Sequence, residues 1–259
     1  MIFLGKAVFP KLEGLDIGIF RLGGPGIGNH LFTMYRGFSI SKRLLVKYLI
    51  PNLMQLKLGP FLRFEDDKRI YSDLWFFDLK RIFHFGPKTL VVTSKSTNFK
   101  RLNIRHINDF KQFLIDKYQI LVNPSYKFKV GVHFRTTDFI VSGTDTDTGT
   151  GLVNVRTPSE WFLRQLSALN PDASVVLFTD DKSNLELFKG VHNIEVDNSR
   201  NALEAIVNLS ECEIILGSRS TFSLWAVVLG SGYFKFSPEF VWEDYFADRH
   251  VSCFQERVL

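Results

Sequence analysis

The sequence of 259 residues has little cysteine and no long apolar run. Each of these absences excludes certain classes of protein. Its two cysteines, Cys212 and Cys253, match no metal-ligand spacing, which predicts a reducing, cytoplasmic compartment. No apolar run approaches the roughly 20 residues that span a bilayer. Charged residues interrupt positions 1–20, so neither a signal peptide nor a membrane anchor is expected there.

Signatures of metal and nucleic-acid binding are scarce as well. No cluster of His, Cys and carboxylate residues has ligand spacing, so no metal is expected. Zinc-finger spacing, an aromatic sheet motif and a helix-turn-helix pattern are missing, which ranks a nucleic-acid-binding protein low. The apolar fraction of 45% and the 26 phenylalanines instead predict well-packed cores, and the length fits two domains.

The net charge of +5 conceals a difference between the two halves of the chain. Residues 1–124 contain 20 Lys and Arg against 9 Asp and Glu, a balance of +11, whereas residues 125–259 balance at −6. A basic half favours an anionic partner such as nucleic acid or an acidic membrane surface. The alternative is that these side chains are simply solvated.

A strand, a glycine turn and a helix start follow one another near the N-terminus. Residues 17–22 form a strand-like run, residues 23–28 are mostly glycine, and Asn29 begins apolar residues at helical spacing. Backbone N–H groups at a helix start bind anions, which makes this turn, with Gly26 and Gly28, a candidate phosphate site.

The second half alternates apolar strands with helices. One helix is expected to begin with Thr157 as N-cap, Pro158 at its first position and Glu160 completing a capping box. Alternation of this kind predicts a parallel sheet, and hence an α/β protein of two Rossmann-like domains, 1–124 and 125–259, facing a central cleft. The predicted strands are 128–132, 174–178, 194–196 and 214–216, and the other predicted helices are 201–210 and 221–230.

Polar side chains follow the strands of the predicted second domain. His133, Arg135 and Asp138 come after strand 128–132, at the sheet edge where ligands bind in open α/β folds. Arginine there suits a phosphate, because its charged fork can bond two oxygens at once. The alternative is a strand end with solvated polar residues.

Two further strand ends offer anion or ribose sites. Asp180 follows strand 174–178 beside Asp181, and Ser220 opens the helix after strand 214–216. Each has an ordinary alternative, namely a side chain that caps the following helix. Together with the glycine turn, these strand ends converge on one predicted cleft, which favours a nucleotide-phosphate ligand.

Four segments resemble, in order and spacing, the motifs of the α-1,2-fucosyltransferases, glycosyltransferase family eleven. Residues 28–32 resemble the first motif. Residues 133–139 resemble the second, a His-x-Arg-Arg-x-Asp-aromatic signature shared with α-1,6- and protein O-fucosyltransferases. Residues 178–181 and 220–225 resemble the third and fourth, so that the resemblance covers residues 17–229.

The resemblance implies a GT-B fold, GDP-fucose as donor substrate, and neither cofactor nor metal. Arg135 would hold the diphosphate, backed by Ser220, Thr221 and Phe222, and His133 would approach the nucleotide. Gly28 and Asn29 would close over the donor from the other domain. Glu204 matches an acidic position that reads guanine, with a solvated helix residue as its alternative.

One departure from the signature concerns its second arginine, which is Thr136 here. The exchange removes a cation from the donor pocket. A related transferase that uses another GDP-sugar therefore stays an alternative. With no metal, a fixed guanidinium must absorb the charge that builds on the β-phosphate as the sugar leaves. The acceptor hydroxyl needs at most a weak base, because the transition state resembles an oxocarbenium ion. Asp138 is a possible base, although we favour that it braces Arg135.

A metal-dependent transferase is a further alternative, because Asp145 and Asp147 resemble the Asp-x-Asp element that binds Mg²⁺ or Mn²⁺ with a diphosphate. A polar loop rich in Thr and Gly is the favoured interpretation of that segment.

The resemblance also implies a galactoside acceptor fucosylated on its 2-hydroxyl, in the synthesis of surface glycans at the inner membrane face. The basic half would then contact anionic lipid, with free oligosaccharide and solubility charge as the alternative. The candidate contact residues are Lys42, Arg43, Lys47, Lys100, Arg101 and Arg105.

Overall fold

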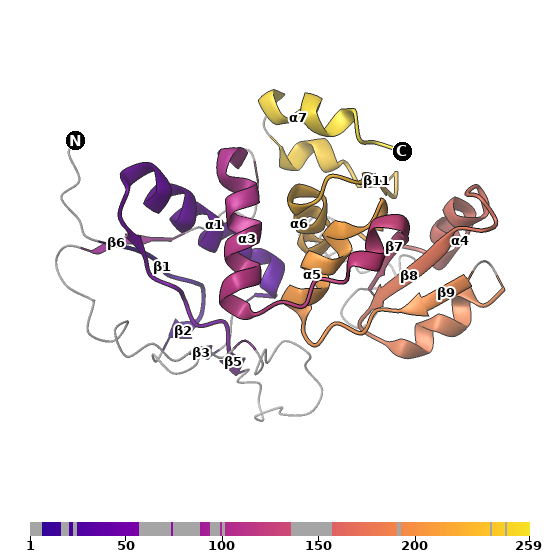
Figure 1. Cartoon of the computed structure of the whole chain (residues 1–259), viewed down its shortest axis with the longest axis horizontal. Coiled ribbons are helices and arrows are strands. Elements are labelled where there is room, and N and C mark those ends of the chain that lie inside the picture. The colour runs from indigo at the N-terminus through magenta and orange to yellow at the C-terminus, as the bar shows by residue number, and fades with distance from the viewer. Residues whose placement is uncertain are drawn as a thin grey trace, which may run out of the picture. The chain divides into compact units, whose positions relative to one another are not determined.

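The computed structural model of the chain contains two compact units, each described here by itself (Figure 1). Unit 1 comprises residues 1–120 and 200–203, and unit 2 comprises residues 121–199 and 204–259. The predicted domain boundary after residue 124 stays a prediction. The structure describes residues 7–16, 21–22, 25–56, 74, 89–93, 99, 102–135, 157–190, 193–238, 240–246 and 248–259.

Unit 1 contains a small parallel sheet that packs against a long helix. Its central strand β1 (Ala7–Pro10) pairs with β4 (Lys47–Tyr48) and β6 (Thr89–Val92). Helix α1 (Ile27–Leu44) buries the apolar face expected from its spacing, namely Leu31, Phe32, Tyr35 and Phe38. The other elements described are β2 (Leu15–Asp16), β3 (Arg21–Leu22), β5 (Gln55–Leu56), η3 (Ile104–His106) and α3 (Ile107–Tyr118).

Unit 2 is built on a five-stranded sheet in the order β11-β10-β7-β8-β9, in which every pair of neighbours is parallel. The predicted α/β class with alternating strands and helices is confirmed. The strands are β7 (Val130–Phe134), β8 (Ser174–Thr179), β9 (Asn193–Val196), β10 (Ile214–Gly217) and β11 (Tyr233–Phe236). No helix of the described ranges is long and apolar enough to cross a membrane.

The first strand of this sheet begins later than the sequence predicts. The prediction of a strand over 128–132 is wrong by two residues, because η4 (Pro124–Phe128) occupies the preceding segment. Asn123 Oδ1 accepts a hydrogen bond from the Ser125 N–H at 3.1 Å, and Pro124 stands at the first helical position. This Asn-Pro start favours a short helix over an extended chain. As a consequence, His133 lies within the strand.

The two faces of the sheet have different covers. Val130, Val132 and Phe134 share an apolar cluster with α4 (Ser159–Ser167) and with Phe188 of η5 (Lys182–Phe188). The opposite face receives α5 (Ala202–Glu211) and α6 (Thr221–Leu229). A Cβ added to Gly131 would lie 2.6 Å from Leu209 of α5, so the missing side chain lets this helix approach the strand.

The start of α4 corrects the predicted capping box. Pro158 occupies the N-cap position, and no side chain caps the helix. Thr157 is buried, and its Oγ1 accepts a hydrogen bond from the backbone N–H of Arg219 at 3.4 Å. A partner 62 positions away in the sequence therefore occupies the hydroxyl that local spacing assigns to the helix.

The C-terminal segment closes the outer edge of the sheet. Arg257 donates from Nε to the Gly232 carbonyl at 2.9 Å and from Nη2 to the Val227 carbonyl at 3.1 Å. Val258 forms a parallel bridge with Phe234 of β11, on the edge of that strand that does not pair with β10. The remaining elements are η6 (Trp242–Tyr245) and α7 (Asp248–Gln255).

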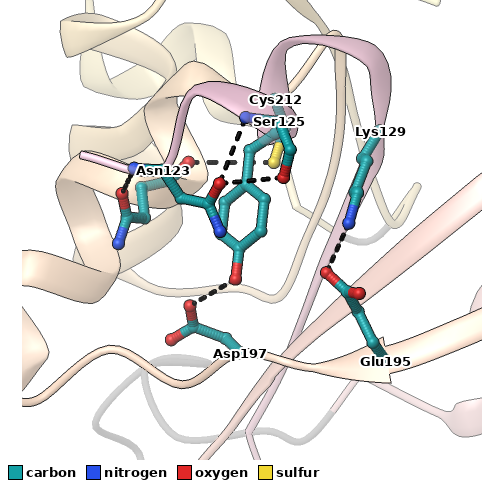
Figure 2. Close-up of polar contacts among 8 residues, drawn as sticks. Asn123, Ser125, Lys129, Glu195, Asp197 and Cys212 are labelled. Atoms are coloured by element: carbon teal, nitrogen blue, oxygen red, sulfur yellow. Dashed lines mark hydrogen bonds and ion pairs between the residues drawn. The ribbon is translucent and has the colours of Figure 1, made fainter. Parts of the chain in front are cut away.

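A polar network holds η4 against the rest of unit 2 (Figure 2). The Tyr126 hydroxyl donates to Asp197 Oδ1 at 3.2 Å, and Lys129 pairs with Glu195 at 2.5 Å. Burial raises the pKa of Asp197, and hydrogen bonds from Ser199 and Tyr126 offset only part of this rise. These contacts fix the segment that leads into β7.

Gly217 leaves room for the Phe236 ring of β11 and for Ser223 of α6, and its contact with Phe236 can be tested. A Cβ there would lie 2.4 Å from the Phe236 ring and 3.0 Å from Ser223 Cβ. We expect Gly217→Ala to lower the free energy of unfolding by about 1–3 kcal/mol through overpacking. Thermal unfolding of the single and double variants with Phe236→Ala measures it: the double variant should lose less than the two single losses combined. Strictly additive losses would contradict this contact.

Candidate functional site

Polar groups gather at the carboxyl edge of the sheet in unit 2. The strand register pairs His133 with Gly217 on one side and with Phe178 on the other, so β10, β7 and β8 end at nearly the same level. Arg135 follows β7, and Asp180 follows β8. The turn from β10 to α6 begins at Ser218. The predicted meeting of these strand ends at one edge is therefore present.

His133 contacts both of the segments that follow β10 at this edge. Its side chain is buried, and Nδ1 shares a hydrogen bond of 2.6 Å with Ser223 Oγ. The imidazole stacks on the Phe222 ring, with centroids 4.4 Å apart and planes 14° apart. Its backbone carbonyl accepts hydrogen bonds from the N–H and the hydroxyl of Ser218, at 3.1 and 2.6 Å. One residue thus connects β7 to both the turn and α6.

The electrostatics keep this imidazole neutral. Burial and, to a smaller extent, the neighbouring Arg135 cation lower the pKa of His133 from 6.5 to about 3, while Asp180 opposes the shift. Both charged side chains therefore lie within electrostatic reach of the ring. These geometries make His133 a brace for the start of α6, and its predicted direct contact with a nucleotide stays a prediction.

The first turn of α6 has the properties of an anion site. Ser220 is its N-cap and accepts the Ser223 N–H through Oγ at 3.3 Å, which is the ordinary capping role considered for it. Thr221 and Phe222 are the first two helical residues, and the first turn contains no acidic side chain. The positive end of the helix dipole is thus left without a carboxylate of its own turn.

Asp181 and Glu204 are engaged in structural hydrogen bonds. Asp181 caps η5 by accepting the Ser183 N–H at 2.9 Å, as the capping alternative predicts. Glu204 is buried, and its Oε2 accepts the backbone N–H of Leu121 at 3.1 Å, so it is not a solvated helix residue. Its predicted contact with guanine stays a prediction.

The glycine turn lies in unit 1 and stands at the start of α1. Gly26 is the N-cap, and its carbonyl accepts the N–H groups of Asn29 at 3.0 Å and His30 at 3.3 Å. The helix begins two residues earlier than predicted, so Gly28 lies inside its first turn. A buried arginine, Arg21, contacts His30 with 3.3 Å between Nη1 and Nε2 and donates to the Asn52 carbonyl.

Several candidates fall outside the part of the chain that the structure describes. They are Asp138, the candidate base, Thr136 of the signature, Asp145 and Asp147 of the metal alternative, and Lys100 and Arg101 of the candidate lipid contact. Among the described residues, no group of three or more His, Cys, Asp or Glu could hold a metal ion.

Ser218 and Ser223 contribute to the site although neither was singled out individually. Ser223 is completely buried in the otherwise apolar part of α6 that faces the sheet. A buried hydroxyl needs a partner, so this one polar position in an apolar helix was the available signal. Ser218 lacks such a signal, because its partner, the His133 carbonyl, is 85 positions away.

Comparison with known proteins gives only distant likenesses. A scan against family models finds no match, and neither does a search of curated proteins. NodZ alpha-1,6-fucosyltransferase soaked with GDP-fucose is 14% identical, with 87% of this chain and 93% of that chain covered and a TM-score of 0.41. NodZ from Bradyrhizobium is 16% identical, with 87% of this chain and 93% of that chain covered and a TM-score of 0.39. POFUT1 in complex with GDP is 13% identical, with 90% of this chain and 73% of that chain covered and a TM-score of 0.35. Because these likenesses are weak, the function has to be inferred from the residues of the site.

The neutral state of His133 is open to direct measurement. The pKa of about 3 lies below the unfolded value of 6.5, so the unfolded chain binds the proton that the fold excludes. The contribution of His133 to the free energy of unfolding is therefore fully present above pH 6.5. As the pH falls below 6.5, this contribution is lost by up to about 1.4 kcal/mol per pH unit.

We expect the NMR signal of His133 Cε1–H, assigned by its loss in His133→Gln, to stay constant from pH 7.5 to 5. The variant should also lose less stability than the wild type over this range. A midpoint near pH 6.5 for that signal would contradict a neutral, buried ring.

Proposed function

We propose that the chain is a metal-independent, inverting glycosyltransferase that moves L-fucose from GDP-fucose to a galactoside hydroxyl in an α-1,2 linkage. The observation that carries the proposal is the carboxyl edge of unit 2, where Arg135 and the start of α6 adjoin a neutral His133. The four motif resemblances add the identity of the donor. In this proposal, the reaction belongs to the synthesis of surface glycans.

The geometry of this edge suits a diphosphate. A phosphate at the start of α6 meets backbone N–H groups and the positive end of the helix dipole. Because His133 stays neutral, it braces the helix without contributing a charge that varies near neutral pH. The invariant charge beside it comes from the guanidinium of Arg135, which remains protonated at any pH of interest.

In the proposed reaction, the bond between the fucose anomeric carbon and the β-phosphate oxygen breaks, and the departing GDP takes the electron pair. The acceptor hydroxyl attacks the opposite face of the sugar, which gives inversion, and its proton passes to water. Arg135 absorbs the charge that develops on the β-phosphate, a contribution of about 2.7–4 kcal/mol for a preorganised donor of this kind. Asp138 in this proposal orients Arg135.

Because Thr136 stands where the signature has its second arginine, another donor sugar is the second candidate within the same reaction class. A sibling transferase would bind GDP through the same edge but transfer a different sugar. Competition of unlabelled GDP-sugars against GDP-fucose separates the two, because the guanine and diphosphate contacts are common to all and only the sugar differs.

Calorimetric titration in the presence of EDTA tests the donor site. We expect GDP to bind and UDP to bind much more weakly. Arg135→Gln should weaken GDP binding about tenfold to a hundredfold, because it removes a charge-assisted contact. Arg164→Gln, which removes an exposed cation from α4, is the matched control and should leave the affinity unchanged. Equal affinities for GDP and UDP would overturn the guanine assignment, and a need for Mn²⁺ would favour Asp145 and Asp147.

The basic residues of unit 1 support a lipid-linked acceptor in this proposal. Arg43, Lys47 and Arg105 are exposed, whereas Lys42 pairs with Asp109 at 3.8 Å and so brings less free charge. We expect sedimentation with anionic vesicles at low salt and not with neutral ones. Each of Arg43→Gln, Lys47→Gln and Arg105→Gln should cost about 1 kcal/mol of binding.

Lys127→Gln, an exposed lysine of unit 2, is the control for that experiment. A wild-type protein that stays in solution with anionic vesicles at low salt would exclude the membrane contact.

A further inference from the structure

The backbone of Arg219 is fixed in the turn between β10 and α6. Its N–H donates to Thr157 Oγ1 at 3.4 Å. The preceding residue, Ser218, bonds the His133 carbonyl through both its N–H and its hydroxyl. The following residue, Ser220, is the N-cap of α6. Arg219 therefore has a defined position at the carboxyl edge of the sheet, between two residues that the edge holds in place.

The side chain of Arg219 brings an uncompensated cation to this edge. Its Nε is buried, and within the described part of the chain it has no hydrogen-bond partner and no carboxylate forms an ion pair with the guanidinium. Burial raises the pKa of the nearby Tyr245, although the charge of Arg219 opposes this rise, so the phenol stays neutral beside it. A partly buried guanidinium donor without a partner is costly, and it is the arrangement that an anionic ligand completes.

The register of the sheet relates Arg219 to Arg135. β7 and β10 are adjacent parallel strands, and His133 pairs with Gly217. Arg135 and Arg219 each stand two residues beyond that pair, on strands that are about 4.8 Å apart in a sheet. Two guanidinium groups that leave one edge at matching positions suit a ligand with two charged groups in a row.

Building on the proposed function, we propose that Arg219 is a second phosphate-binding residue of the donor site and bonds the diphosphate together with Arg135. Each guanidinium can bond two phosphate oxygens, so the pair can serve both phosphates of a nucleoside diphosphate. The second cation that the signature places next to Arg135, and that Thr136 lacks, is in this arrangement supplied by the neighbouring strand.

Calorimetry with GDP and with guanosine, in EDTA, tests this role. Arg219→Gln should weaken GDP binding about tenfold or more and leave guanosine binding unchanged, since only GDP carries the phosphates. Arg219→Lys should recover part of the GDP affinity, because it restores the charge without the fork. Arg164→Gln is the matched control for the loss of one positive charge.

The outcomes separate this inference from the proposed function. If the wild type binds GDP and Arg219→Gln binds it equally well, Arg219 is not a phosphate ligand and the proposed function stands. If the wild type binds no GDP, the proposed function fails, and this inference fails with it. If Arg219→Gln does not fold in a thermal unfolding control, Arg219→Lys decides: unchanged GDP affinity overturns the role, and a loss confined to GDP supports it.

Discussion

The contact on which the candidate site depends is the one between His133 and the first turn of α6. A single buried imidazole bonds Ser223, stacks on Phe222 and stays uncharged. A charged ring at this place would repel Arg135 and any cation of the following turn, so the low pKa is a condition for placing guanidinium groups at the same edge. The lack of a side chain at Gly217 is the second condition, because it lets α6 come close enough for these contacts.

Much of unit 2 could be predicted from sequence because its signals are local. The central strands β7, β8 and β10 are short, largely buried apolar runs, and the four strands that were predicted have bounds within a residue or two of those found. Ser220 and Asp181 cap the elements that follow them, and such caps bond only backbone N–H groups two or three positions away. The convergence of the strand ends follows from the parallel order of the strands alone.

Two of the predictions that were wrong or incomplete concern partners distant in the sequence. Thr157 has every local property of an N-cap, yet its hydroxyl bonds Arg219 in a different crossover. Glu204 has the spacing of a ligand-binding residue and the helical setting of a solvated one, and its carboxylate holds the backbone of Leu121, 83 positions earlier. No local pattern contains these partners. They arise only when the sheet brings separate crossovers together, which is why the same residue types supported several interpretations.

The charge of the candidate site also differs from the charge of the sequence that builds it. Residues 125–259 are acidic overall, but some of their carboxylates are used structurally: Glu195 pairs with Lys129, and Asp197 accepts a hydrogen bond from Tyr126 (Figure 2). Asp197 also accepts a hydrogen bond from the Ser199 hydroxyl. The negative charge is thus engaged around η4 and β9, while the first turn of α6 contains no acidic residue. A unit that is acidic overall can therefore still place guanidinium groups beside a helix start, since local placement, and not net charge, sets the potential that a phosphate meets.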